Sequence, residues 1–149
     1  MKYIISSIGK SSKSDEEKIT QKYLKRLKNV ELNQYEAKTN NVKLKIIEEG
    51  TKLIKSTPLN AKLILLDEQG ENLSSKELAK LVLDWKENSI SSINFAIGGP
   101  YGNGVQIKKT ADKMIAFGRQ TWPHQMVKIM LAEQIYRIET ILRGHPYHK

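Results

Sequence analysis

Residues 61–66, with the sequence AKLILL, decide the fold class of this chain. The run ends in four consecutive apolar residues, a pattern typical of a strand that is buried on both faces of a parallel sheet. Two further β-rich segments surround it in the sequence, Lys2–Ile8 (KYIISSI) and residues 93–97 (INFAI). We therefore expect a sheet whose central strands are covered on both sides.

Segments with helical periodicity alternate with these strands. Ser14 precedes an acidic first turn and the apolar series Ile19, Tyr23, Leu24, Leu27, which predicts a capped helix. Further helices are predicted over Val42–Lys55, from Ser74 to about Glu87, around 106–112 and from Pro123 to about Leu142, and further strands at 30–37 and 114–117. This alternation predicts an α/β fold with a mostly parallel sheet flanked by helices. The length of 149 residues fits one domain, 1–149.

The composition excludes several classes of protein. The chain is 39% hydrophobic and 28% charged, as in globular proteins, and no apolar run reaches the roughly 20 residues of a membrane span. There is no cysteine, which excludes disulfides, thiolate metal sites and cysteine nucleophiles. We therefore expect a cytoplasmic protein without membrane association.

The charge is strongly basic, with 25 Lys and Arg against 16 Asp and Glu. Residues 1–60 and 101–149 carry the excess, whereas 61–100 are slightly acidic. Such a field attracts polyanions, RNA above all, through the phosphates. A lysine-rich surface that only maintains solubility explains the charge equally well.

A glycine-rich segment, GGPYGNG at 98–104, directly follows the apolar run 93–97. It lacks the GxGxxG spacing of dinucleotide-binding enzymes, and the chain has no phosphate-binding P-loop, GxSxG or HExxH motif. Paired glycines at a strand end let a ligand approach the backbone, but they also occur in turns that need positive φ angles. Both interpretations stay open from the sequence.

The C-terminal region concentrates chemically active side chains. All three histidines, His124, His145 and His148, occur there, together with Arg137, Arg143, Tyr136 and Tyr147. Chain ends are normally simple in composition, so this end is expected to dock onto a partner rather than to be a solvated tail. Pro146 prevents His145 and His148 from sharing a helical face, and we expect no metal site.

The helix expected over 123–142 has two apolar surfaces. Its main stripe would pack on the sheet, and Ile129 and Tyr136 lie outside that stripe. The second patch needs another partner, either the rest of the chain or a second subunit, and we favour a dimer. Arg137 has a simpler alternative role, an i,i+4 ion pair with Glu133 on an exposed helix face.

Five motifs together carry a family resemblance. They are Leu65-Leu66-Asp67 with Gly70, IGGPYG at 97–102, TWPHQM at 121–126, EQIYR at 133–137 and GHPYH at 144–148. In this order they resemble the bacterial large-subunit ribosomal RNA methyltransferase H family, which belongs to the SPOUT class. The chain departs from the family pattern at Gly118, where a small hydroxyl residue is common, and at Lys128, where arginine is frequent.

The resemblance implies a trefoil-knotted α/β fold that acts as a homodimer. It implies methylation of N3 of a pseudouridine in 23S rRNA, within the large ribosomal subunit or the assembled ribosome, with S-adenosyl-L-methionine as cofactor. DNA is not an expected partner. The alternative is a non-catalytic basic RNA-binding module of the ribosome, which the charge alone would also satisfy.

The resemblance also assigns site residues. Three loops would bind the cofactor, through Leu66, Gly98, Phe117, Gly118, Arg119, Gln120, Thr121 and Trp122. Target binding and proton handling would fall to His124, Arg137, Tyr147 and His148. In the resembling family the tail of one subunit closes over the cofactor of the other.

Overall fold

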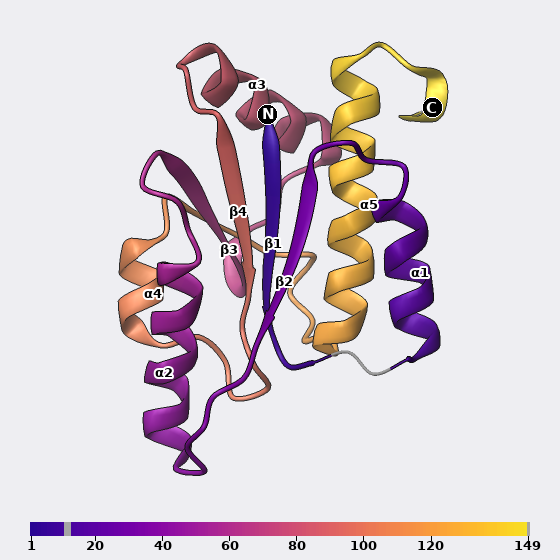
Figure 1. Cartoon of the computed structure of the whole chain (residues 1–149). Helices are drawn as coiled ribbons and strands as arrows, with labels where there is room; N and C mark the ends of the chain where they lie inside the picture. The colour runs from indigo at the N-terminus through magenta and orange to yellow at the C-terminus, as the bar shows by residue number, and fades with distance from the viewer. Residues whose placement is uncertain (11–12, 149) are drawn as a thin grey trace.

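We describe the fold from a computed structural model, which covers residues 1–10 and 13–148, without the side chain of His148. Figure 1 shows a central sheet with helices on both faces. The elements follow in the order β1 (Lys2–Ile8), α1 (Asp15–Leu24), β2 (Val30–Tyr35), α2 (Val42–Lys55), β3 (Ala61–Glu71), α3 (Ser75–Glu87), β4 (Ser92–Ile97), α4 (Val105–Thr110), β5 (Lys113–Ile115), α5 (His124–Leu142) and the 3₁₀ helix η1 (Pro146–His148).

The sheet has five strands in the order β2-β1-β4-β3-β5, and every neighbouring pair is parallel. Leu66 of β3 pairs with Ile97, the last residue of β4, and with Ile115, the last residue of β5. The segments that follow Leu66, Ile97 and Ile115 therefore leave the same edge of the sheet, which is where α/β proteins bind ligands.

Both faces of the sheet are covered, as the apolar runs predict. Helices α1, α3 and α5 pack on one face, and α2 and α4 cover the other (Figure 1). Alternate residues of each strand enter the two cores: Ile64 and Phe95 lie in the larger one under α5, whereas Leu65 and Ala96 lie in the smaller one under α2 and α4. The predicted α/β class is confirmed.

Helix ends follow the expected capping chemistry. The hydroxyl of Ser14 accepts the backbone N–H of Glu17, and Ser74 and Glu77 form a capping box with both hydrogen bonds present. The predicted bounds of α2 are confirmed. At α5 the prediction was wrong by one position: Pro123 is the N-cap, with ψ 133, and the helix begins at His124.

Other strand and helix bounds also differ from the sequence prediction. Strand β2 stops at Tyr35, and β4 begins one residue earlier than predicted, at Ser92. Helix α4 and strand β5 each begin one residue earlier and end two residues earlier than predicted. Strand β3 continues past Leu66 to Glu71, because an irregular register lets Glu71 pair again with Ile115. Within the described residues no helix is long and apolar enough to cross a membrane. The trefoil knot stays a prediction of the resemblance.

Candidate functional site

A cavity of about 800 Å³ opens at the carboxyl ends of β3, β4 and β5. Three segments surround it: the residues after Leu66, the glycine turn at 98–103 and the segment 115–124 that leads into α5. Sequence separation is large, but parallel pairing brings these three strand ends together. The cavity therefore lies where the motifs predicted a binding site.

Apolar side chains and bare backbone form the walls of the cavity. Leu66, Phe117 and Trp122 line it, and the indole N–H of Trp122 donates to the Phe117 carbonyl at 2.9 Å. Gly118 adopts a φ of +90°, which favours glycine, and its N–H donates to the Asn72 side chain at 2.8 Å. These contacts hold the segment 117–122 in a folded bend.

The paired glycines of the turn serve a purpose that the sequence analysis did not find. Gly102 has a φ of +82°, as the turn interpretation expects, but Gly98 and Gly99 are not among the glycines with positive φ. Instead, a Cβ atom at position 98 would lie 2.1 Å from Oδ1 of Asn103, and one at position 99 would lie 2.6 Å from Oε2 of Glu49. The absence of side chains at Gly98 and Gly99 thus lets two polar side chains of the protein itself approach the turn.

Glu49 is an unusual neighbour for this turn. Glu49 is only 2% exposed, and neither of its carboxylate oxygens has a hydrogen-bond partner. Burial raises its pKa, and the nearby Lys45 opposes that shift. The protonated, neutral form is therefore favoured more strongly than in an exposed glutamate.

A polar cluster at one wall of the cavity was also missed by the sequence analysis. Asp67 accepts hydrogen bonds from Asn103 Nδ2 and Lys108 Nζ, both at 3.0 Å, and from the backbone N–H of Gln69. All four residues line the cavity. The one available signal was the position of Asp67 directly after a buried strand, because strand ends place polar side chains at the ligand-binding edge.

The predicted cofactor-binding residues converge, with one exception. Those that line the cavity are Leu66, Gly98, Phe117, Gly118, Gln120, Thr121 and Trp122. The hydroxyl of Thr121 donates to the carboxylate of Glu68 in β3 at 2.7 Å, which links these two walls of the cavity. Arg119 is exposed and is not among the lining residues.

His124 is the predicted catalytic residue that reaches this cavity. Its Nε2 lies close to Gly9, where a Cβ atom would be 3.4 Å away. Burial lowers the pKa of His124, and the positive charge of Lys128 lowers it further. Lys128 itself is fully buried, and the nearby Glu17 counteracts the lowering of its pKa by burial. Burial and the charge of Lys128 thus both favour the neutral imidazole of His124 over the imidazolium.

Arg137 and Tyr147 lie elsewhere, at the other end of α5. They are separated from His124 by 13 or more residues, which for Arg137 is about 20 Å along a helix. Figure 1 shows the C-terminal segment at the end of the sheet opposite to the strand ends that form the cavity. One chain thus brings His124 to the cavity but not Arg137 or Tyr147.

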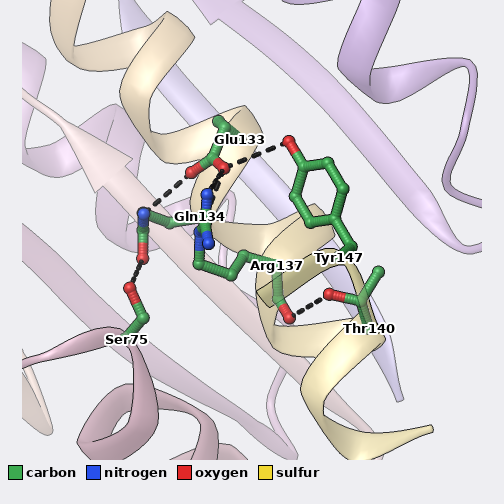
Figure 2. Close-up of polar contacts among 6 residues, drawn as sticks. All are labelled: Ser75, Glu133, Gln134, Arg137, Thr140 and Tyr147. Carbon is green, nitrogen blue, oxygen red and sulfur yellow. Dashed lines mark hydrogen bonds and ion pairs between the residues drawn. The ribbon is translucent and has the colours of Figure 1, made fainter. Parts of the chain in front are cut away.

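Glu133 organises this second group. Figure 2 shows its carboxylate between Arg137, Gln134 and Tyr147. Arg137 donates from Nε and Nη2 to Oε1 at 3.0 and 2.6 Å, and the Tyr147 hydroxyl donates to the same oxygen at 3.3 Å. Gln134 donates to Oε2 and accepts from the Ser75 hydroxyl at the start of α3. The ion pair left open as an alternative for Arg137 is therefore present.

The tail after α5 is a folded structure. The N–H groups of Gly144 and His145 donate to the carbonyls of Ile141 and Thr140, and Gly144 has a φ of +67°, which together form a Schellman motif. The ring of Tyr147 then packs on Tyr136 at 4.7 Å and under the Arg137 guanidinium at 5.2 Å. The side chain of His148, the fourth predicted catalytic residue, lies outside the described part.

A second groove, of about 530 Å³, runs between α1, α3 and α5. Ile129 and Met130 of α5 line it together with Ile19 and Tyr23 of α1 and with Phe117. Tyr136, the other residue of the predicted second patch, contacts Tyr23 and Tyr147 within the chain. The structure therefore covers Tyr136 in part but leaves Ile129 beside an open groove.

Comparison with known proteins adds a family to this geometry. Residues 1–148 match the family model described as "Predicted SPOUT methyltransferase". The chain belongs to the SPOUT methyltransferase family. Relatives named "Ribosomal RNA large subunit methyltransferase H" include those of Paramagnetospirillum magneticum, at 36% identity, and Bartonella tribocorum, at 37%, each aligned over 100% of this chain and 99% of the relative. The relative of that name from Chelativorans is 52% identical over 68% of this chain and 58% of its own length.

The family membership confirms the resemblance found in the motifs, and with it the prediction of a SPOUT methyltransferase. The non-catalytic RNA-binding module is not favoured, because the whole length of the chain matches enzymes. Among the described residues of this SPOUT methyltransferase there is no group of three or more histidine, cysteine or acidic side chains that could hold a metal ion.

Proposed function

We propose that this chain transfers a methyl group from S-adenosyl-L-methionine to N3 of a pseudouridine in 23S rRNA, within the large subunit or the assembled ribosome. The observation that carries the proposal is the convergence of seven predicted cofactor-binding residues on one cavity. The names of the relatives support ribosomal RNA as the target. We place the reaction in the cytoplasm, where ribosomes work, and assign it to one domain, 1–149.

The cavity fits such a donor chemically. Leu66, Phe117 and Trp122 offer an apolar surface to an adenine ring, and the strand ends offer backbone amides and carbonyls for its polar edge. S-adenosyl-L-methionine supplies a methyl group on a positively charged sulfur, which needs no further activation. The chain has to hold the two reactants in line and exclude water.

N3 of a pseudouridine carries a proton that must leave during methylation. His124 lines the cavity, and its lowered pKa favours the neutral imidazole, the form that can take up a proton. We propose that His124 would accept the N3 proton as N3 bonds to the methyl carbon, while the bond between that carbon and the donor sulfur breaks and S-adenosylhomocysteine leaves. Residue 9 borders the ring, because a Cβ atom at Gly9 would lie 3.4 Å from Nε2 of His124.

A homodimer would bring the remaining predicted residues to the cavity. Arg137 and Tyr147 lie at the far end of α5 in their own chain, so we propose that they, with His148, serve the cavity of a partner subunit. The groove beside Ile129 supports an interface on α1 and α5, because apolar surface of this kind is normally covered. The excess of basic residues, which gives a net charge of +9, would bind the phosphates of the target RNA.

Calorimetry with S-adenosyl-L-methionine tests the donor, and saturable binding of one molecule per chain is expected. The absence of binding to the folded protein would overturn the proposal. Mass mapping of 23S rRNA from cells that lack the protein tests the target. We expect one pseudouridine to lose its N3 methyl group, and methylation that is unchanged at every pseudouridine would refute the substrate.

Sedimentation tests the homodimer. The wild-type chain should have about twice the mass of 17.0 kDa, and Ile129→Glu should shift it toward the monomer, because a charge cannot be buried there without cost. Leu59→Glu is a matched control, since Leu59 is fully exposed. An active monomer at micromolar concentration would contradict the dimer.

A further inference from the structure

The side chain of Asn103 connects the glycine turn at 98–103 to β3 through hydrogen bonds. Its Nδ2 donates to the Leu66 carbonyl at 3.1 Å and to Asp67 Oδ2 at 3.0 Å. The two N–H groups of one amide are therefore both used, and both bonds cross from the segment after β4 to Leu66 and Asp67 of β3. The Asn103 amide thus connects two of the three segments that surround the cavity.

The Asp67 carboxylate, which accepts one of these hydrogen bonds, is itself held in place by other residues. The Asp67 side chain is only 6% exposed and lies 3.0 Å from Lys108 Nζ. Burial disfavours the charge of Asp67, but hydrogen bonds from Asn103, the Gln69 N–H and Lys108 outweigh burial and lower its pKa. Lys108 comes from α4, so the carboxylate joins β3, the turn and α4 at one point.

The position of the Asn103 amide depends on the absence of a side chain at Gly98. A Cβ at position 98 would lie 2.1 Å from Asn103 Oδ1, so the amide fits only because residue 98 is glycine. The amide of Asn103 lies against Gly98 and Leu66, and both are predicted cofactor-binding residues that line the cavity. Asn103 was not among the predicted site residues.

We propose that Asn103 is a positioning residue that holds the Leu66 carbonyl and the glycine turn at the spacing required to bind the methyl donor. This inference rests on the proposed function of the cavity. A preformed site does not spend binding free energy on ordering its loops, so loss of the connection should weaken donor binding. The rate of methyl transfer at saturating donor should change little, since Asn103 positions backbone groups that bind the donor.

The hydrogen bond to the Leu66 carbonyl also permits the opposite hypothesis, that Asn103 hinders donor binding. The experiment must distinguish the two hypotheses. The Asn103 amide occupies the Leu66 carbonyl, and a donor molecule could compete for that oxygen. A carbonyl oxygen has two lone pairs, however, so one remains for a ligand while the amide stays in place. Asn103 also bonds Asp67, which would hold the amide in its present position.

The test compares Asn103→Ala with wild type by calorimetric titration with S-adenosyl-L-methionine and by methylation of 23S rRNA. We expect Kd and KM for the donor to rise about ten-fold, as for the loss of two hydrogen bonds, and kcat to stay within about two-fold. Asn88→Ala is the matched control, because its side chain caps the exposed end of α3 and donates to the Asp84 carbonyl. This control should bind the donor like the wild type.

Unchanged donor affinity in Asn103→Ala would refute the positioning role, and tighter binding would show that the amide competes with the donor. A wild-type protein that does not bind the donor would instead refute the proposed function of the cavity. The two failures are therefore distinguishable.

A single and a double variant of unchanged side-chain size test whether the effect comes from the hydrogen bond rather than from loss of the fold. Asn103→Asp replaces the amide donor by a carboxylate beside the Leu66 carbonyl and Asp67, so donor binding should fall below that of Asn103→Ala. Adding Asp67→Asn reverses the direction of the hydrogen bond between positions 67 and 103 and should recover part of the affinity. Equal affinities of the single and double variants would contradict the proposal.

Discussion

Arg137 donates two hydrogen bonds to one carboxylate oxygen of Glu133, and the same oxygen accepts the hydroxyl of Tyr147 (Figure 2). The i,i+4 ion pair therefore also anchors the tail to the helix. Both side chains are largely shielded from solvent, so salt screens this pair less than an exposed one. An arginine fixed in this way would present a preordered cation to a partner subunit.

Glu133→Gln should loosen the tail without unfolding α5. The substitution keeps the size of the side chain but removes the charge that Arg137 and Tyr147 contact. We expect faster amide hydrogen exchange at 144–147 and a decrease in kcat of about ten-fold, with donor affinity unchanged.

Glu87→Gln provides the control for this variant, because Glu87 is an exposed residue at the end of α3. Exchange in the tail that equals that of the wild type would show that Glu133 does not hold it.

Glu49→Gln should stabilise the protein at neutral pH. The buried carboxyl has no hydrogen-bond partner, and its pKa is raised above the ordinary 4.5. The folded chain therefore holds the Glu49 proton more tightly than the unfolded chain, and the free energy of unfolding falls as pH rises from 4.5 through the raised pKa.

Thermal unfolding of both proteins between pH 4 and pH 8 measures this effect. At pH 8 the variant should melt about 2–4 °C above the wild type, equivalent to about 1 kcal/mol, and the gain should shrink toward pH 4. A difference that does not depend on pH would show that Glu49 carries no shifted proton.

His124 should titrate below its ordinary pKa of 6.5, because burial and Lys128 both disfavour the imidazolium. Methylation at saturating substrates should accordingly reach a plateau above pH 7 and decline as the pH falls through the lowered pKa. NMR titration of the imidazole, assigned with His124→Asn, measures the pKa directly.

His124→Asn itself should lower kcat by about 10²-fold, the usual contribution of a general base. If this variant keeps the pH profile of the wild type, another group accepts the N3 proton.

The sequence predicted what depends on short-range pattern and on motif order. The apolar run at 61–66 and Ser74 at the start of its helix mark their elements locally, and the motifs locate the three segments of the cavity. Contacts between distant segments were not predictable. The need for glycine at 98 and 99 comes from Asn103 and Glu49, and the sequence does not indicate that these side chains approach the turn.

The end of strand β3 was predicted wrongly for a related reason, because it depends on a contact between distant residues. Strand β3 continues to Glu71 only because Ile115, far along the chain, pairs with it a second time. Similarly, the separation of His124 from Arg137 follows from their positions on one helix, and only the proposed dimer would bring Arg137 to a cavity.

Removal of residues 144–149 separates the two ends of α5 functionally. The described part of this tail packs on Tyr136 and Arg137 and does not line the cavity of its own chain. We expect methylation of 23S rRNA to be abolished while donor binding falls only modestly, because tyrosine and histidine stack on unpaired bases and arginine and lysine hold the flanking phosphates. Calorimetry with S-adenosyl-L-methionine and RNA methylation measure the two effects separately. The opposite result, weak donor binding with activity restored at saturating donor, would mean that the tail covers the donor and does not act on RNA.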